Sequence, residues 1–277
     1  GVSTGFEKIT EGGQTGWRLI GRNPLNFGNI GNNAVDASYG SADNTDGARG
    51  DYSFASGFNT AAASTGTVAM GYQSTASGQY SIAIGYQSKA YAFGSVALGY
   101  QNTSNSSTSF TAGSGNTTGG GGSVALGMSN VAYGLASVSL GNANKAEAEA
   151  SIAIGDNTST KNKAEIAAGS FNTLDTSSDI SFSQNSRRLF TIGNGVSSTV
   201  LSDAFTVLRN AKVGIDIDNF ETTASDSKLQ VNGGIQIKSE TTTLDAANCN
   251  SNTRGKIIFV NDNFYGCKST GWVQLNN

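Results

Sequence analysis

The sequence is short of the side chains that most enzymes use. Its 277 residues include no His, which removes the commonest general base and metal ligand and makes a His-dependent triad impossible within one chain. No pair of carboxylates and no Ser–Lys arrangement stands out as catalytic. Asp216 and Asp218 lie in GIDIDN, but the distal Glu of a calcium loop is missing, so we expect solvated acids there. We therefore expect no enzyme activity, no cofactor and no metal site.

The side chains that could bind a ligand recur at a fixed spacing. The tripeptide GYQ begins at positions 71, 85 and 99 and places an aromatic and an amide group in two columns: Tyr72, Tyr86 and Tyr100, with Gln73, Gln87 and Gln101 beside them. Phe58 precedes the Tyr column, and Ser114 and Met128 interrupt it. Such columns bind sugar rings through flat apolar contact and a polar edge, or they stabilise adjacent strands as stacked ladders. Both interpretations stay open.

A second aromatic group lies near the C-terminus. Phe264, Tyr265 and Trp272 belong to RGKIIFVNDNFYGCKSTGWVQL, in which KIIFV, NFYGC and WVQL predict three short strands of a β-meander. Aromatic residues this dense are either the core of so small a module or part of a binding surface. We hypothesise that this module contacts a binding target.

The only two cysteines, Cys249 and Cys267, are close together in the sequence. They suit a local disulfide in an oxidising setting, and two free cytosolic thiols are the alternative. A bridge would enclose residues 250–266, a loop worth roughly 3 kcal/mol in the chain-entropy model.

The composition favours ordered β-structure with many tight turns. Charged residues make up 13% of the chain, about half the usual fraction, and there are 37 Gly but one Pro. A net charge of −3 gives no basic footprint for nucleic acid. The 13 Phe, 9 Tyr and 2 Trp argue against a disordered tether. No apolar run approaches the length of a membrane helix.

Nine glycines keep an unbroken 14-residue register, and each ends a motif such as SIAIG or SVALG. We expect the missing Cβ to supply a turn that other residues resist. The glycine-dense stretch at 113–123 lacks the Lys-Ser/Thr pair with which a phosphate-binding loop ends. We therefore expect this stretch to form a surface bulge between coils. The nine glycines are Gly57, Gly71, Gly85, Gly99, Gly113, Gly127, Gly141, Gly155 and Gly169.

The motif alternates as a β-strand does. In SIAIG, Ile82 and Ile84 point one way while Ser81 and Ala83 point the other. A second small cluster half a repeat later indicates two strands of about five residues per repeat, so that one repeat is one coil of a β-solenoid. Only small residues fit a narrow interior, and the opposite face carries a stripe of Val, Ile, Leu, Met and Phe. Such a stripe needs burial, which copies of the same chain would provide.

The repeats resemble the head repeats of the trimeric autotransporter adhesins, the YadA-like head. The resemblance rests on SIAIGYQSKAYAFGSVALG and covers about residues 50–170. It implies a left-handed parallel β-roll, three chains around one axis, and a place on a surface fibre. Residues 189–237, with IGNG, SDAFTVL and KLQVNG, are similar to shaft segments of bacteriophage tail fibres, as is the N-terminal stretch.

Four segments are therefore predicted: a cap segment at 1–49, the roll at 50–172, a β-rich connector at 173–238 and a disulfide-stapled tip at 239–277. The predicted function is a non-enzymatic, homotrimeric, extracellular fibre that binds a target-cell glycan or protein, as a bacterial adhesin or on a virion tail. We expect neither nucleic-acid binding nor insertion into the membrane. The alternatives are a fibre-borne glycan depolymerase and an ice-binding solenoid, although lysines interrupt the Thr column that ice binding requires.

Overall fold

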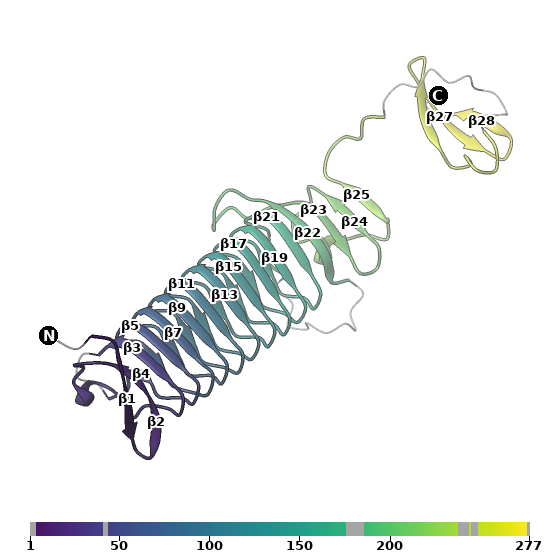
Figure 1. Ribbon diagram of the computed structural model, residues 1–277. Coiled ribbons are helices and arrows are strands. Elements are labelled where there is room, and N and C mark those ends of the chain that lie inside the picture. The colour runs from purple at the N-terminus through teal and green to yellow at the C-terminus, as the bar shows by residue number, and fades with distance from the viewer. Residues whose placement is uncertain (1–3, 41–43, 176–185, 238–243, 245–248, 276–277) are drawn as a thin grey trace. The chain divides into compact units, whose positions relative to one another are not determined.

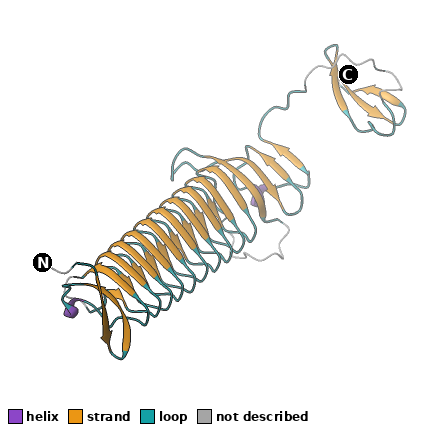
Figure 2. Cartoon of the chain, viewed as in Figure 1, coloured by secondary structure: helices purple, strands orange, loops and turns teal. Residues whose placement is uncertain are grey.

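The computed structural model describes residues 4–40, 44–175, 186–237, 244 and 249–275. These residues are almost entirely strands and turns (Figures 1 and 2), which confirms the prediction of an all-β chain. They fall into two compact units, Gly1–Gln230 and Val231–Asn277. The predicted cap, the roll and most of the predicted connector thus belong to one unit. The predicted boundary between 238 and 239 lies outside the described residues.

The N-terminal unit is a β-solenoid whose strands follow one another in chain order along two parallel ladders (Figure 1). Each coil contributes one strand of five residues and one of only two, so the second strand is shorter than predicted. The five-residue strands are β3 (Val35–Tyr39), β5 (Phe54–Phe58), β7 (Val68–Tyr72), β9 (Ile82–Tyr86), β11 (Val96–Tyr100), β13 (Phe110–Ser114), β15 (Val124–Met128), β17 (Val138–Asn142), β19 (Ile152–Asp156) and β21 (Ile166–Ser170). The two-residue strands are β4 (Gly47–Ala48), β6 (Ala61–Ala62), β8 (Thr75–Ala76), β10 (Lys89–Ala90), β12 (Thr103–Ser104), β14 (Thr117–Thr118), β16 (Val131–Ala132), β18 (Lys145–Ala146) and β20 (Ser159–Thr160).

The interior of the roll is narrow and half polar. Both strands of each coil point a small residue inward, and Ala69, Ala76 and Ala83 are fully buried. A Ser or Thr precedes eight of the ten five-residue strands and is buried in each case, as Ser81 and Ser95 show. The predicted interior of small residues is therefore confirmed. Because these side chains are short, opposite walls of the coil approach closely and each coil packs on its neighbours.

The repeat glycines lie inside the strands, at the fourth of five positions, and not at the turn. All nine have φ between 97° and 128°, a region that side chains with a Cβ rarely adopt. A Cβ built on Gly99 would lie 2.3 Å from the carbonyl oxygen of Gly113, the equivalent glycine of the next coil. Two requirements therefore select glycine here: the backbone conformation and the close stacking of coils. The turn follows two residues later, where Gln73, Gln87 and Gln101 adopt left-handed backbone.

The glycine-dense stretch at 113–123 forms an ordinary coil. Phe110 pairs with Val124 in the same parallel register as every other coil, which leaves no extra residue for a bulge. The expected bulge is therefore wrong. Glycine is tolerated at these positions because the flanking strands and the fixed 14-residue spacing determine the path of the chain.

The parallel stack extends beyond the recognised repeats at both ends. At its start, β3 pairs with β5, and the hairpin of β1 (Phe6–Glu11) and β2 (Gln14–Leu19) pairs in turn with β3 and covers its free edge. The 3₁₀ turn at Pro24–Asn26 precedes Phe27 and Ile30, which are buried beneath this hairpin.

Buried charges hold the hairpin to the first coil. Arg18 lies 3.1 Å from Asp36 and 2.7 Å from Glu11, with its guanidinium 4.7 Å from the ring centre of Phe27.

The stack ends with a change of strand direction. The strand β22 (Arg188–Asn194) pairs parallel with β21, but β23 (Asp203–Leu208) and β24 (Val213–Ile215) continue the sheet antiparallel, and β25 (Leu229–Val231) is the last strand. The short helix α1 (Phe220–Thr223) inserts Phe220, which is fully buried against Gly214. No helix in the described residues is both long and apolar enough to span a bilayer.

The C-terminal unit contains the predicted meander. The strands β26 (Ile257–Val260), β27 (Asn263–Lys268) and β28 (Gly271–Gln274) form one antiparallel sheet. The disulfide between Cys249 and Cys267 is present, with Cα atoms 5.3 Å apart, and this pairing is confirmed. It ties the segment before the meander to the central strand.

Candidate functional site

The predicted Tyr column forms a ladder of stacked rings along one edge of the roll. Ring centroids of Tyr72, Tyr86 and Tyr100 are 5.1 and 5.0 Å apart with nearly parallel planes. The ladder continues through Phe58 to Tyr39, with centroid distances of 5.4 and 5.6 Å. Sequence reasoning missed Tyr39 because its separation from Phe58 is longer than one repeat, which places it outside the 14-residue register. The strand pairing of VDASY with FASGF is the signal that places it.

The stacking decides which parts of these rings are accessible. Each inner ring is covered on both faces by its neighbours, so the flat contact that a sugar ring makes with an aromatic face is not available there. All four tyrosines of the ladder are nevertheless 40–52% exposed. The ladder therefore stabilises adjacent coils and presents a polar edge to solvent.

The Gln column lies beside the aromatic ladder and forms a second ladder. Gln87 donates from Nε2 to Oε1 of Gln73 at 2.7 Å, and Gln101 donates to Gln87 at 2.9 Å. These three side chains, with Lys89 and Thr103, line an open groove of about 370 Å³. Of the residues predicted to bind a ligand on the roll, the three glutamines line this groove, and the tyrosines are not among its lining residues.

A third column, inside the roll, was not predicted. The position three residues after each repeat glycine is Asn in four consecutive coils, and each amide is fully buried. Asn116 donates to the carbonyls of Ala112 and Gly127 and to Oδ1 of Asn102, so one side chain joins neighbouring coils. The members are Asn102, Asn116, Asn130 and Asn144. Their common register, where earlier coils have Thr60, Ser74 and Ser88, was the available signal.

The predicted apolar stripe lies on the outer face of the five-residue strands. Ile82 and Ile84 are partly exposed in the single chain, whereas Ala83 between them is fully buried. The same pattern recurs in each coil from Val68 to Val138, so the stripe is continuous along the stack.

The aromatic residues of the C-terminal unit are half-buried. Phe264 packs against Phe259 with ring centroids 4.9 Å apart, and Trp272 lies opposite Cys267 in the sheet. Tyr265 pairs with Ile258 on one side and Gln274 on the other. Part of each ring therefore packs within the module, and the rest faces solvent.

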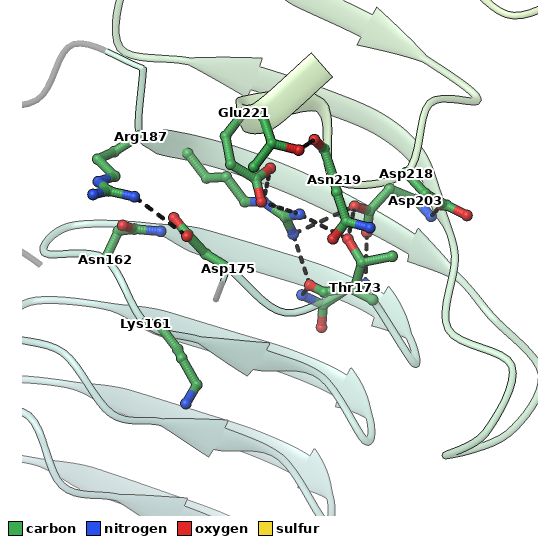
Figure 3. Close-up of polar contacts among 12 residues, drawn as sticks. Lys161, Asn162, Thr173, Asp175, Arg187, Asp203, Asp218, Asn219 and Glu221 are labelled. Carbon is green, nitrogen blue, oxygen red and sulfur yellow. Dashed lines mark hydrogen bonds and ion pairs between the residues drawn. The ribbon is translucent and has the colours of Figure 1, made fainter. Parts of the chain in front are cut away.

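Buried charged side chains meet where the repeats end (Figure 3). Arg188 is fully buried and donates to both carboxylate oxygens of Glu221 at 2.7 and 3.0 Å. It also bonds the carbonyl and hydroxyl of Thr173 at 2.7 Å each, and its NH1 is 3.3 Å from Asp203. Thr173 in turn donates through its backbone and hydroxyl to Asp203. Four segments distant in sequence are thus joined at one cation.

Burial shifts the protonation of two carboxyls near Arg188. Burial raises the pKa of Glu165, against the lowering effects of the backbone N–H groups of Asn162 and Lys161 and of the charge on Arg188. It likewise raises the pKa of Asp203, against the lowering effects of Arg188 and Thr173. Arg187 and Asp175 form a separate, nearly buried pair at 3.4 Å, labelled in Figure 3.

Asp216 and Asp218, the two acids compared above with a calcium loop, do not face a common site. Asp218 accepts a hydrogen bond from the backbone N–H of Asp203 at 2.7 Å, and Asp216 is exposed on left-handed backbone. Across the described ranges, no three Cys, Asp or Glu side chains are grouped so that they could hold a metal ion.

Comparison with known protein families finds one match. The family described as the YadA head domain repeat matches residues 48–74, 62–88, 76–102 and 132–158, which are coils of the roll. The resemblance of the repeats is therefore confirmed, whereas the resemblance of the C-terminal region to phage tail fibres is not. A search of the curated proteins finds no match.

Proposed function

We propose that this chain is part of an extracellular adhesive fibre that assembles as a homotrimer and binds a glycan or protein on a target cell without acting as an enzyme. YadA head repeats point to an adhesin-like, surface-exposed fibre of the trimeric autotransporter type. The observation that carries the proposal is the continuous apolar stripe on the same coils, which is partly exposed in one chain. Apolar stripes of this length mark interfaces, and rotational symmetry closes them.

Assembly is tested by measuring the mass of the full chain in native buffer. We expect a trimer that Val124→Asp dissociates, because Val124 belongs to the stripe and a buried unpaired carboxylate is strongly disfavoured. Thr117→Asp is the matched control, since Thr117 is partly exposed on the two-residue strand before it and lies outside the stripe. A monodisperse wild-type monomer would contradict the proposal.

Attachment is tested with the full chain on beads offered to target cells. We propose that Phe264, Tyr265 and Trp272 supply part of the contact, since part of each ring faces solvent. Deletion of residues 239–277 should then weaken attachment and leave the melting transition of the roll unchanged. Undiminished attachment would place the whole contact on the roll. Release of reducing sugars from the cell surface would overturn the non-enzymatic assignment in favour of a glycan depolymerase.

A further inference from the structure

One region of the roll is almost free of charge. From residue 52 to residue 144 the sequence contains a single charged side chain, Lys89, whereas 13% of the whole chain is charged. An ammonium group without nearby carboxylates keeps its full attraction for an anion, because nothing in its surroundings neutralises it.

Lys89 lies in the groove beside the Gln ladder. The side chain is exposed, and within the described part of the chain its ammonium group makes no ion pair or hydrogen bond. The lysines further along the roll differ: Lys161 lies 3.4 Å from Glu147, and Lys163 lies 2.7 Å from Glu149. The cation in the groove is therefore available to a ligand.

The walls of the groove carry groups that recognise hydroxyls. The two hydrogen bonds of the Gln ladder run in one direction, so Nε2 of Gln73 and Oε1 of Gln101 have no partner among the described residues. Each amide also keeps a second N–H. Left-handed backbone at all three glutamines and the bonds between them hold the amides in a row, and Thr103 adds a hydroxyl. Preorganised groups lose little entropy when a ligand binds.

We propose that this groove binds a sugar that bears a carboxylate, such as a uronic or sialic acid residue, with Lys89 on the carboxylate and the Gln amides on the hydroxyls. The proposal rests on the proposed adhesive function and names the ligand class for the roll. A nucleic acid requires many cations, and this groove has one. A protein hot spot requires a desolvated apolar pocket, whereas the groove is lined by amides, a hydroxyl and an ammonium group.

The position of the groove is compatible with assembly through the stripe. Lys89 and Thr103 belong to the two-residue strands, and the glutamines belong to the turns, whereas the stripe lies on the five-residue strands. No residue that lines the groove is part of the stripe.

The test uses the full chain and measures binding to immobilised hyaluronan octasaccharide, 3′-sialyllactose and neutral dextran. We expect binding to one or both carboxylated sugars, weakening as salt is raised, and none to dextran. Lys89→Gln should weaken binding about tenfold to a hundredfold, the loss expected for a charged hydrogen bond. Gln87→Asn, which shortens the central amide, should weaken it less. Lys145→Gln is the matched control, because Lys145 occupies the same position of the repeat four coils away, outside the groove.

The two acidic sugars distinguish a uronate from a sialic acid as the ligand. Equal binding to dextran, equal losses in Lys89→Gln and Lys145→Gln, or no binding to either acidic sugar would overturn the proposal. Cell attachment separates this outcome from the proposed function. Attachment without acidic-sugar binding rejects the groove alone, whereas sugar binding without attachment rejects the adhesive fibre alone.

Discussion

The interior of the repeat coils and the interior at the end of the roll are both polar, but they are stabilised in opposite ways. The coils bury neutral hydroxyls and amides, such as Ser81 and Asn116, whereas the end buries Arg188 with Asp203 and Glu221. In a repeat, each side chain stacks on its own copy. An amide can donate to and accept from an identical amide, but stacked like charges repel. Buried charge therefore requires a break in the repeat, where different segments supply opposite signs.

The outer surface obeys the same rule. Where charges do stack on neighbouring coils, their signs alternate, as Glu147 with Lys161 and Glu149 with Lys163 show. The lone Lys89 is flanked in its column by Thr75 and Thr103, which are neutral.

The largest effect should come from removing the buried cation. Arg188→Met leaves Asp203 and Glu221 buried without their partner, so we expect a loss of about 3–5 kcal/mol in the free energy of unfolding, measured by urea denaturation. Lys163→Met instead removes the partner of the exposed Glu149 and should cost under about 1 kcal/mol. Similar losses in the two variants would remove the distinction between the two regions.

A somewhat smaller loss in the free energy of unfolding is expected where two neighbouring coils contact each other at their repeat glycines. Gly99→Val forces a β-branched residue into positive φ and drives its Cβ into the carbonyl of Gly113, which should cost about 2–4 kcal/mol. Gly94→Val is the control, because the same residue type enters positive φ (+60°) but a Cβ there meets nothing closer than 3.7 Å. Thermal melts of both variants separate coil contact from backbone conformation, and an equally large loss in the control would assign the effect to φ alone.

The buried Asn column can be disrupted by a substitution that introduces no charge. Asn116→Leu preserves approximate volume but leaves the Gly127 carbonyl, the Asn130 N–H and Oδ1 of Asn102 without this partner. Burying such groups unpaired should cost about 1–3 kcal/mol in denaturant titrations. Asn105→Leu, on an exposed position, should change little. If both variants unfold at the same denaturant concentration, the amide ladder contributes nothing measurable.

A lower pH should stabilise the fold through a carboxyl buried at the end of the roll. Since burial raises the pKa of Glu165 above its ordinary value of 4.5, the folded chain holds a proton at a pH where the unfolded chain has lost it. Stability should thus rise as the pH falls from neutrality toward 4.5 and decline as the pH rises through the folded pKa. In Glu165→Gln the rise should be smaller, as melting temperatures across this range would reveal. An unchanged pH profile would mean that Glu165 titrates alike in both states.

The smallest change in stability is expected at the charged side chains that stack on the outer surface of neighbouring coils. Glu147→Lys stacks two lysines in adjacent coils and should cost about 0.5 kcal/mol at low salt, with most of the loss recovered at high salt. A loss that salt does not reduce would point to packing of the side chains.

Residues within the repeat were predictable because each position is repeated many times. The strands, the buried Ala and Ser columns, the aromatic ladder and the apolar stripe all follow from the 14-residue register. The three strands and the disulfide of the tip follow from local alternation and from two nearby cysteines. These are features in which sequence neighbours are also neighbours in space.

The rest depends on contacts between residues outside the register. Gly193 pairs with Gly169 across a separation that is not a multiple of the repeat, so β22 joins the stack although FTIG follows a segment without repeats. The bonds of Arg188 reach Thr173 and Glu221, 15 and 33 residues away. The groove was missed for another reason. The columns that contain the glutamines and Lys89 were considered separately, and the turn between them is what brings both columns into the same groove.

The fixed register also determines how the roll responds to a pulling force. The hydrogen bonds between successive strands of a ladder, such as β7 and β9, run between coils, so tension along the stack loads them directly. One coil occupies about 4.8 Å of the stack, but its 14-residue chain extends to about 46–50 Å when freed. A terminal coil that detaches therefore releases about ten times the length that it occupied in the stack.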